Sequence, residues 1–158
     1  MTIDLKELRR VMGHFATGVT VVTTKDGADA PFGLTANAFA SLSLQPPLVL
    51  VCVDKDAHCY SCFEGSKIFA VNVLAEGQEE ISRRFATKGA EKFNGIPWHK
   101  GESGVALLDG AISHIECKVV SSYDGGDHTI YVGEVLRAAT AGERPLIFFQ
   151  GKYHRLPG

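Results

Sequence analysis

The fold of this chain is decided in the uncharged stretch Gly33-Leu34-Thr35-Ala36-Asn37-Ala38-Phe39-Ala40-Ser41-Leu42-Ser43-Leu44-Gln45-Pro46-Pro47. In extended backbone, successive side chains point to opposite faces, so Thr35 and Asn37 share one face while Leu42 and Leu44 turn into a core. The exposed hydroxyl, amide and N–H groups suit a flat heterocycle or a phosphate, because both ligands need oriented donors at close range. A polar turn beside an edge strand explains the same pattern equally well.

On either side of this stretch, hydrophobic patterns predict many strands and few helices. Strand-like runs rich in Val, Ile, Thr and aromatic residues cover residues 18–25, 48–53, 67–74, 111–122, 128–138 and 146–153. Short helices are expected at 4–15, 57–64 and 76–86, the first capped by Asp4 and packed against the rest of the molecule. Residues 87–103 predict a long ordered loop beside a functional site. Without β-α-β alternation, the strands predict an antiparallel sheet that hides its edges, most simply by closing into a barrel.

Length and composition favour one domain that binds small molecules. With 158 residues and 45% hydrophobic content, the chain is long enough for a single core, so we expect one domain over residues 1–158. A net charge of −2 with mixed signs argues against nucleic-acid and membrane-surface partners, which attract proteins with a basic face. No apolar run approaches the ~20 residues that span a bilayer, and residues 1–6 lack a signal-peptide pattern. We therefore expect a cytoplasmic protein.

The four cysteines, Cys52, Cys59, Cys62 and Cys117, are too few and too scattered for a disulfide scaffold, so we expect free thiols. Cys59 and Cys62 form a C-x-x-C pair, which is compatible with a redox dithiol or with half of a zinc site. No second pair follows, and the histidines do not stand at ligand spacing from it. We therefore predict no metal site and favour two small residues on a short helix.

Six further motifs flank residues 33–47. They are FATGVTVVTT at 15–24, LVLVCV at 48–53, FAVNVL at 69–74, RFA at 84–86, GDH at 126–128 and PLIFFQGKY at 145–153. In order and separation, the whole set resembles the short-chain flavin reductases, the small reductase components of two-component flavin monooxygenases. The resemblance covers nearly the whole chain. Motifs in register over this length are specific for the family. They are less specific for which flavin is bound and for which monooxygenase is the partner.

The resemblance implies a mainly β fold, an antiparallel split β-barrel that binds FMN, with a few short peripheral helices. It also implies a homodimer and NAD(P)H:flavin oxidoreductase activity. In that activity NADH or NADPH stacks on bound FMN or FAD, hydride passes to the flavin, and reduced flavin leaves for a partner flavin-dependent monooxygenase. Hydride transfer between stacked rings needs proximity rather than a side-chain acid or base, so the lack of an evident catalytic dyad counts little against it.

The resemblance also implies roles for individual residues. Against the isoalloxazine and the ribityl chain it places Thr35, Ala36, Asn37, Phe39 and Ser41. Around the flavin phosphate it places the turn Cys52-Val53-Asp54-Lys55-Asp56-Ala57-His58-Cys59, and near the flavin and its tail Arg84, Phe85, Ala86 and Lys92. On the nicotinamide side it places Phe148, Phe149, Gln150, Gly151 and Tyr153. His128 is implied beside both rings, as an orienting hydrogen-bond donor rather than a proton carrier.

The phosphate turn departs from the family's pattern. Relatives commonly have serine or threonine near positions 57 and 59, whereas this chain has Ala57 and Cys59, with Asp54 and Asp56 nearby. A thiol is a poor hydrogen-bond donor and carboxylates repel phosphate, so phosphate binding depends on backbone N–H groups and on basic side chains such as His58. The choice between FMN and FAD therefore stays open, as does the choice between NADH and NADPH.

The sequence carries no G-x-G-x-x-G after a strand, no P-loop and no nucleophile elbow, so Rossmann dinucleotide binding, nucleotide hydrolysis and triad chemistry are unsupported.

Two functions other than flavin reduction fit the same residues. The first is a flavin-bound electron carrier, which would keep its flavin tightly and oxidise NAD(P)H slowly. The Cys59/Cys62 pair slightly favours this hypothesis. A ligand-binding domain without a redox role would not bind added FMN or FAD.

Overall fold

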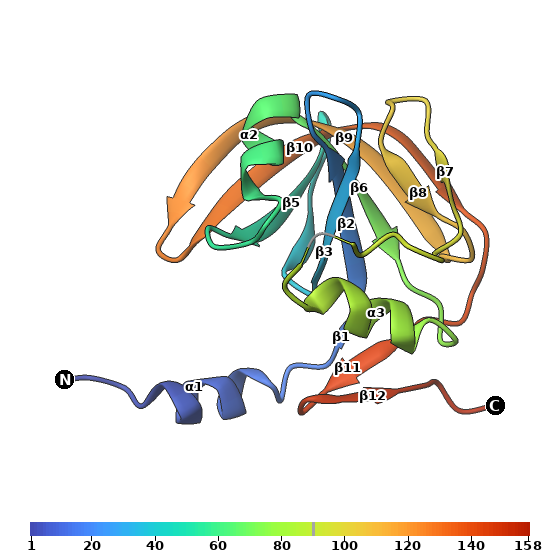
Figure 1. The fold of residues 1–158 in the computed structure, drawn as a ribbon. Helices are drawn as coiled ribbons and strands as arrows, with labels where there is room; N and C mark the ends of the chain where they lie inside the picture. The colour runs from blue at the N-terminus through green and yellow to red at the C-terminus, as the bar shows by residue number, and fades with distance from the viewer. Residues whose placement is uncertain (90) are drawn as a thin grey trace.

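The computed structural model describes residues 1–89 and 91–158. This part of the chain holds three short helices, α1 (Leu5–Met12), α2 (Tyr60–Ser66) and α3 (Glu79–Ala86). Its strands are β1 (Thr17–Gly18), β2 (Thr20–Lys25), β3 (Pro31–Ala36), β4 (Phe39–Leu44), β5 (Pro47–Asp54), β6 (Ile68–Val73), β7 (Trp98–Lys100), β8 (Ala106–Leu108), β9 (Ser113–Gly125), β10 (His128–Thr140), β11 (Ile147–Phe149) and β12 (Lys152–His154). The protein is mainly β, as predicted, with the helices at its periphery (Figure 1).

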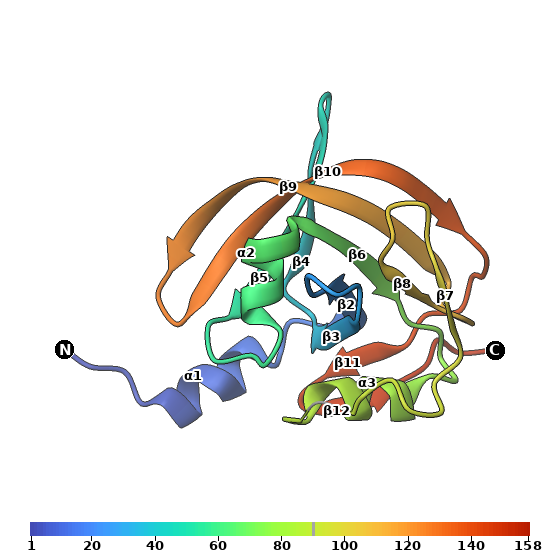
Figure 2. The same cartoon turned by 45° about the horizontal axis from the view of Figure 1, so that its top comes forward.

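Seven of the strands form one antiparallel sheet in the order β3-β2-β6-β9-β10-β5-β4. The long strands β9 and β10 arch over the others in Figure 1, and the hairpin of β4 and β5 projects beyond the sheet in Figure 2. A separate sheet of β1, β11 and β12 lies below α3 in Figure 1, and β7 pairs with β8. The architecture is an open, curved sheet rather than a clearly closed barrel.

The curvature follows from how the chain connects the two edges of this sheet. β3 and β4 are consecutive strands at opposite edges, and only Asn37 and Ala38 lie between them. Three trans peptides reach at most ~11 Å, whereas seven flat strands would span ~29 Å, so the sheet must roll until its edges approach. The Ala38 carbonyl accepts from Cys52 N at 3.0 Å, which holds the connection against β5. We call these two residues the seam.

The core lies on both faces of β2, because neighbouring side chains of a strand point in opposite directions. Val22 packs in one buried cluster with Phe63 of α2 and Phe69 of β6. Val21 packs in the other cluster with Phe85 of α3, together with apolar side chains from β8 and the segment before β11. Burial of a phenylalanine at this depth is typically worth about 3–5 kcal/mol against alanine, so each cluster fastens one helix to the sheet.

Two sequence predictions about the surface are wrong. Residues 1–12 are all exposed, and α1 extends away from the sheet instead of packing on it (Figures 1 and 2). Asp4 does cap the helix, by accepting from Lys6 N at 3.0 Å. Leu42 and Leu44 do not enter a core: they are 48% and 90% exposed, because the hairpin that carries them projects beyond the sheet.

Two predicted segments also differ in detail. The last predicted strand, 146–153, is a hairpin of β11 and β12, since Gln150 and Gly151 turn the chain with φ of 51° and 74°. The predicted loop at 87–103 contains β7, which pairs with β8. Both strands have three residues, too short for a clear alternating pattern in the sequence. No helix within the described residues is long and apolar enough to cross a membrane.

Candidate functional site

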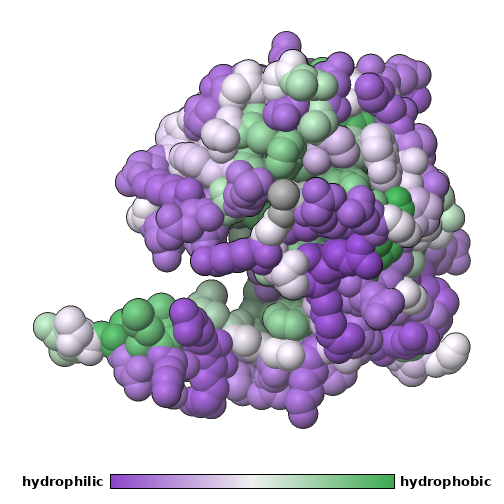
Figure 3. Space-filling model, viewed as in Figure 1, coloured by the Kyte–Doolittle hydropathy of each residue, from purple (hydrophilic) through white to green (hydrophobic). Residues whose placement is uncertain are grey.

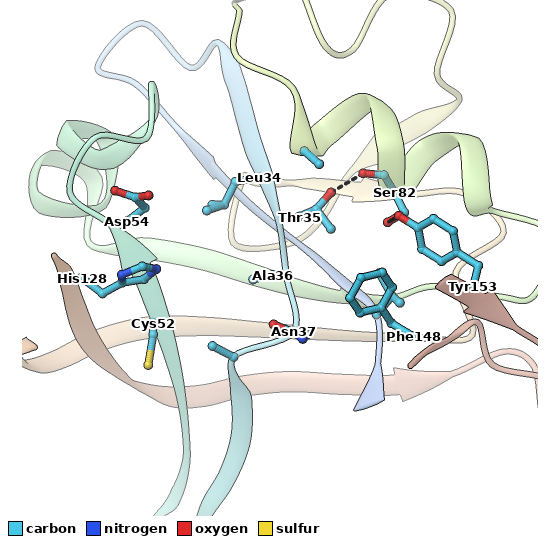
Figure 4. A pocket seen from close by; sticks show the side chains of 13 residues that line it. Leu34, Thr35, Ala36, Asn37, Cys52, Asp54, Ser82, His128, Phe148 and Tyr153 are labelled. Carbon is cyan, nitrogen blue, oxygen red and sulfur yellow. Dashed lines mark hydrogen bonds between the residues drawn. The ribbon is translucent and has the colours of Figure 1, made fainter. Parts of the chain in front are cut away.

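A cavity of ≈ 340 Å³ opens beside the seam. It lies where the ends of β3, β5 and β10 approach α3 and the β11–β12 hairpin, as Figure 4 shows. The lining residues are Val19, Leu34, Thr35, Ala36, Asn37, Ala38, Cys52, Asp54, Ser82, Ala86, His128, Phe148 and Tyr153. Small and uncharged side chains along β3 leave backbone exposed on this wall, so a flat ligand can approach it closely.

The wall formed by β3 is tied to α3 by a hydroxyl. Thr35 Oγ1 donates to the main-chain oxygen of Ser82 at 2.6 Å (Figure 4), and the Ser82 hydroxyl lies 2.6 Å from the Tyr153 hydroxyl. α3 presents Ser82 and Ala86 to the cavity because residues four apart share one face of a helix. Three distant segments therefore meet at Ser82.

His128 stands at the opposite side of the cavity from the aromatic residues (Figure 4). It is the first residue of β10, directly opposite Asp54 in the β5 ladder, and it follows a turn at Gly126 with φ of 81°. Its Nδ1 lies 2.7 Å from Asp127 Oδ1. An ionised carboxylate only accepts, so Nδ1 carries the proton and Nε2 is left for a ligand. The same hydrogen bond keeps the pKa of Asp127 below its ordinary value.

An aromatic wall faces His128. The rings of Phe148 in β11 and Tyr153 in β12 have centroids 5.4 Å apart, and the Arg83 guanidinium lies 5.2 Å from the centre of the Tyr153 ring. Such rings offer a flat apolar surface for another ring, and Arg83 gains a cation–π contact. The cavity thus combines a polar backbone wall, an imidazole and an aromatic wall.

A second cavity of ≈ 210 Å³ adjoins the first and shares Leu34, Thr35, Asp54 and Ala86 with it. Its remaining lining is Asp56, Ala57, His58, Phe85, Thr87, Lys88 and Lys92. Lys92 Nζ donates to the Gly33 and Phe85 carbonyl oxygens at 3.3 and 3.1 Å. Desolvation lowers the pKa of this ammonium. Acidic and basic side chains therefore face the same space. An anion can bind there only where the basic side chains and backbone N–H groups are closer to it than the carboxylates are.

Most of the predicted site residues line these two cavities. The first receives Thr35, Ala36, Asn37, Cys52, Asp54, Ala86, His128, Phe148 and Tyr153, and the second receives His58, Phe85 and Lys92. Cys59 borders a small pocket of ≈ 10 Å³ with His58 and Lys92. The sequence motifs thus converge on one region of the molecule, although the role of each residue stays a prediction.

The other predicted residues lie outside the two cavity linings. Phe39 packs against the core and Val53 is fully buried in it, while Ser41 is exposed on β4. The Lys55 ammonium is paired with the Asp124 carboxylate, and Arg84 Nη1 donates to the Asn94 carbonyl at 2.6 Å. Phe149, Gln150 and Gly151 belong to the β11–β12 hairpin, where Gln150 Nε2 lies 2.8 Å from His14 Nε2.

Ser82 is the main residue that the sequence reasoning missed. Serine on a helix is common and carries no motif, so nothing distinguished it from a surface residue. A usable signal is its spacing: Ser82 and Ala86 are small residues four apart on the face that also carries buried Phe85. Small side chains at such spacing allow close approach of the helix to neighbouring strands or to a ligand.

The cysteine pair offers little for redox chemistry. All four cysteines are free thiols, and burial raises the pKa of the Cys59 thiol to about 11. Burial also raises the pKa of Cys62. Because the thiolate is the reactive form, burial makes both thiols less reactive than an exposed cysteine near neutral pH. Among the described residues, no group of three or more His, Cys, Asp and Glu side chains is arranged to hold a metal ion.

Comparisons with known proteins identify the family of this chain. The model of the flavin reductase like domain matches residues 12–157. An NADH-dependent FAD reductase of Streptomyces globisporus is 46% identical over 158 residues, covering 96% of this chain and 86% of that protein. The reductase subunit HsaB of a flavin-dependent monooxygenase from Rhodococcus jostii (strain RHA1) is 43% identical over 152 residues, covering 96% of this chain and 77% of that protein.

A solved structure matches the fold as closely. The NADH:FAD oxidoreductase of Streptomyces globisporus, in complex with NAD and FAD fragments, superposes with a TM-score of 0.91 at 44% identity. The match covers 99% of this chain and 97% of that chain. The family model, the relatives and the solved structure all cover almost the whole sequence, so the chain belongs to the flavin reductase like domain family.

Proposed function

We propose that this protein is an NADH-dependent flavin reductase, which passes hydride to FMN or FAD and supplies reduced flavin to a partner flavin-dependent monooxygenase. The observation that carries the proposal is the paired cavity at the seam, with a backbone wall, an aromatic wall and His128 around one space. The similar proteins named as an NADH-dependent FAD reductase and as a monooxygenase reductase subunit support it.

The residues present fit a flavin. A cavity of ≈ 340 Å³ falls in the size range of small-molecule sites, which is roughly 300–1,000 Å³. The adjoining cavity of ≈ 210 Å³ extends it in one direction, so that a ring with a polar tail can occupy both. The bound flavin supplies the redox chemistry by accepting hydride from the nicotinamide.

The protein's part in this reaction is to bind, orient and exclude water. Thr35, Asn37 and the backbone around them meet the polar edge of the flavin ring, which needs donors and acceptors in one plane. Phe148 and Tyr153 form an apolar wall, and the nicotinamide would lie against it. His128 offers Nε2 to the substrates from the opposite side, since its Nδ1 is engaged by Asp127.

The phosphate end lies in the second cavity under this proposal. His58, Lys88 and Lys92 supply positive charge there, whereas Asp54 and Asp56 oppose it. Weak holding of the phosphate follows from these opposing charges, and a flavin that dissociates readily is what a supplier of free reduced flavin requires. Both FMN and FAD remain substrates under the proposal, with NADH as the reductant.

Stopped-flow mixing tests the proposal. The protein is mixed with NADH or NADPH in the presence of FMN, FAD or no flavin, and loss of nicotinamide absorbance is followed. We expect rapid, flavin-dependent oxidation of NADH and many turnovers of added free flavin. Retention of one flavin per chain with slow NADH oxidation would instead identify an electron carrier, and absence of flavin binding would identify a ligand-binding domain without redox function.

We also propose that residues 1–158 form one split-barrel domain and that two copies assemble as a homodimer. The seam supports the split barrel, because it joins the two edges of the rolled sheet. Exposed apolar side chains on α1 (Figure 3) and on the β4–β5 hairpin support the dimer, since such surfaces are commonly covered by a partner. Free thiols fit the reducing cytoplasm, where we expect the protein, and cell fractionation tests that location.

A further inference from the structure

Ser82 is the point at which the two walls of the cavity are joined. The residue is fully buried on the inward face of α3 and lines the cavity. Its main-chain oxygen accepts from Thr35 Oγ1 at 2.6 Å, and its own hydroxyl lies 2.6 Å from that of Tyr153. The backbone of Ser82 thus contacts the β3 wall, while its side chain contacts the aromatic wall (Figure 4).

The first contact determines what Thr35 can offer to a ligand. A threonine hydroxyl has one proton and two lone pairs, and in this structure the proton points to the Ser82 carbonyl. Only lone pairs are left for the cavity, so Thr35 accepts a hydrogen bond and donates none. The flavin ring carries an N–H group flanked by carbonyls, and an acceptor at Thr35 selects the N–H rather than a carbonyl.

The second contact compensates for a weakly supported strand. Tyr153 lies in β12, which has three residues and pairs only with the three-residue β11 in its sheet. So short a ribbon is held by few backbone hydrogen bonds, and its register and tilt need support from side chains. Packing on Phe148 fixes the ring from one side, and the bond to the Ser82 hydroxyl fixes the far end of the ring.

We propose that Ser82 is a positioning residue, whose hydroxyl holds Tyr153 as the wall for the nicotinamide while its main-chain oxygen orients Thr35 toward the flavin. This assignment rests on the proposed flavin reductase function. The two contacts can be separated, because substitution of the Ser82 side chain removes the hydrogen bond to Tyr153 and leaves the main-chain oxygen in place for Thr35. The binding of the nicotinamide and of the flavin should therefore respond differently to the same substitution.

The test compares Ser82→Ala, Tyr153→Phe and the double variant. Each single change removes one partner of the same hydrogen bond, so we expect KM for NADH to rise about five-fold in both, the factor that one neutral hydrogen bond contributes. The double variant should be no worse than either single variant, because the partners act as a unit. The dissociation constant for flavin, measured by fluorescence titration without NADH, should stay within about two-fold of wild type.

Tyr60→Phe is the matched control. It removes a hydroxyl pair of the same kind, Tyr60 with Thr129 at 2.7 Å, between α2 and β10 and outside both cavity linings. We expect its KM for NADH to equal that of wild type. The assignment is overturned if Ser82→Ala leaves KM unchanged, if it weakens flavin and NADH equally, or if Tyr60→Phe raises KM as much. Wild-type protein that does not oxidise NADH with any flavin overturns the proposed function itself.

Discussion

At the scale of single residues, substitution of His128 tests whether hydride is transferred in the cavity that this residue lines. Its Nδ1 is engaged by Asp127 at 2.7 Å, which leaves Nε2 to orient the substrates. We expect His128→Ala to slow hydride transfer about ten-fold and to change flavin affinity less, because an orienting contact matters most where two rings must align. Stopped-flow rates and fluorescence titration measure the two quantities.

His99→Ala is the control for this substitution. His99 Nδ1 lies 2.6 Å from Asp109 Oδ1, and this comparable histidine–aspartate pair is outside both cavity linings. Removal of His99 should leave both the transfer rate and the flavin affinity unchanged. Equal losses in the two variants would mean that a surface pair of this kind affects activity through the fold alone.

Thr35 and Asn37 are expected to behave in the opposite way. Thr35→Val combined with Asn37→Leu removes polar groups from the β3 wall, so flavin affinity should fall about ten-fold while hydride transfer at saturating flavin changes less. Thr35→Ser keeps the hydroxyl and should retain flavin affinity. If the paired variant instead slowed transfer without weakening binding, Thr35 and Asn37 would exchange roles with His128.

The cysteines give a test of the cavity that needs no turnover. Burial raises the pKa of Cys59 to about 11 and that of Cys117 to about 12, so both thiols stay protonated at pH 8 and react only as the pH approaches those values. Cys52 is partly exposed and lines the cavity. Iodoacetamide at pH 8, followed by mass spectrometry, should label Cys52 first, and bound flavin should slow that labelling. Unprotected Cys52 would place the flavin elsewhere.

At the scale of elements, the packing of β10 depends on a close approach of the Phe69 side chain of β6 to Gly133. A Cβ added at Gly133 would lie 2.5 Å from Phe69 Cζ and 2.9 Å from Cys117 Cβ. Phe69 is buried and cannot move freely, so Gly133→Ala should lower the free energy of unfolding by about 2 kcal/mol. Urea denaturation measures the change. Gly27→Ala, with no heavy atom within 4 Å of the added Cβ, should leave stability nearly unchanged.

α1 provides the second test at this scale. Its apolar side chains are exposed, with Leu8 at 38% and Met12 at 62%, and the proposed homodimer gives them a partner. Leu8→Glu with Met12→Glu should therefore shift the sedimentation coefficient toward that of a monomer, while the circular dichroism spectrum is kept. A dimer unaffected by these charges would place its interface away from α1.

Buried strands could be predicted from local sequence patterns. The hydrophobic runs at 18–25, 48–53 and 67–74 became β2, β5 and β6, because buried strands carry their own signal in side-chain type. The exposure of α1 and of Leu44 could not be predicted in the same way. An amphipathic pattern states that a face will be covered, and it does not state whether the same chain covers it.

At the scale of the whole molecule, residues from distant motifs lie together. Thr35, His128 and Tyr153 line one cavity, although the first and the last are 118 positions apart in the sequence. The strand order could not be read from the sequence, because pairing between distant strands depends on global closure rather than on local propensity. Local patterns in residues 33–47 therefore do not reveal that β3 and β4 lie at opposite edges of the sheet.

The seam has a thermodynamic consequence. Asn37 and Ala38 are the covalent link between the two edges, and the ligand cavity lies directly beside them. A molecule bound there touches β3 from one edge and β5 from near the other, so its binding energy opposes any spreading of the rolled sheet. Flavin affinity and the local stability of β3 are thus linked. A change that lets β3 open more easily must also weaken flavin binding. Amide exchange in β3 reports on the cofactor as directly as its fluorescence does.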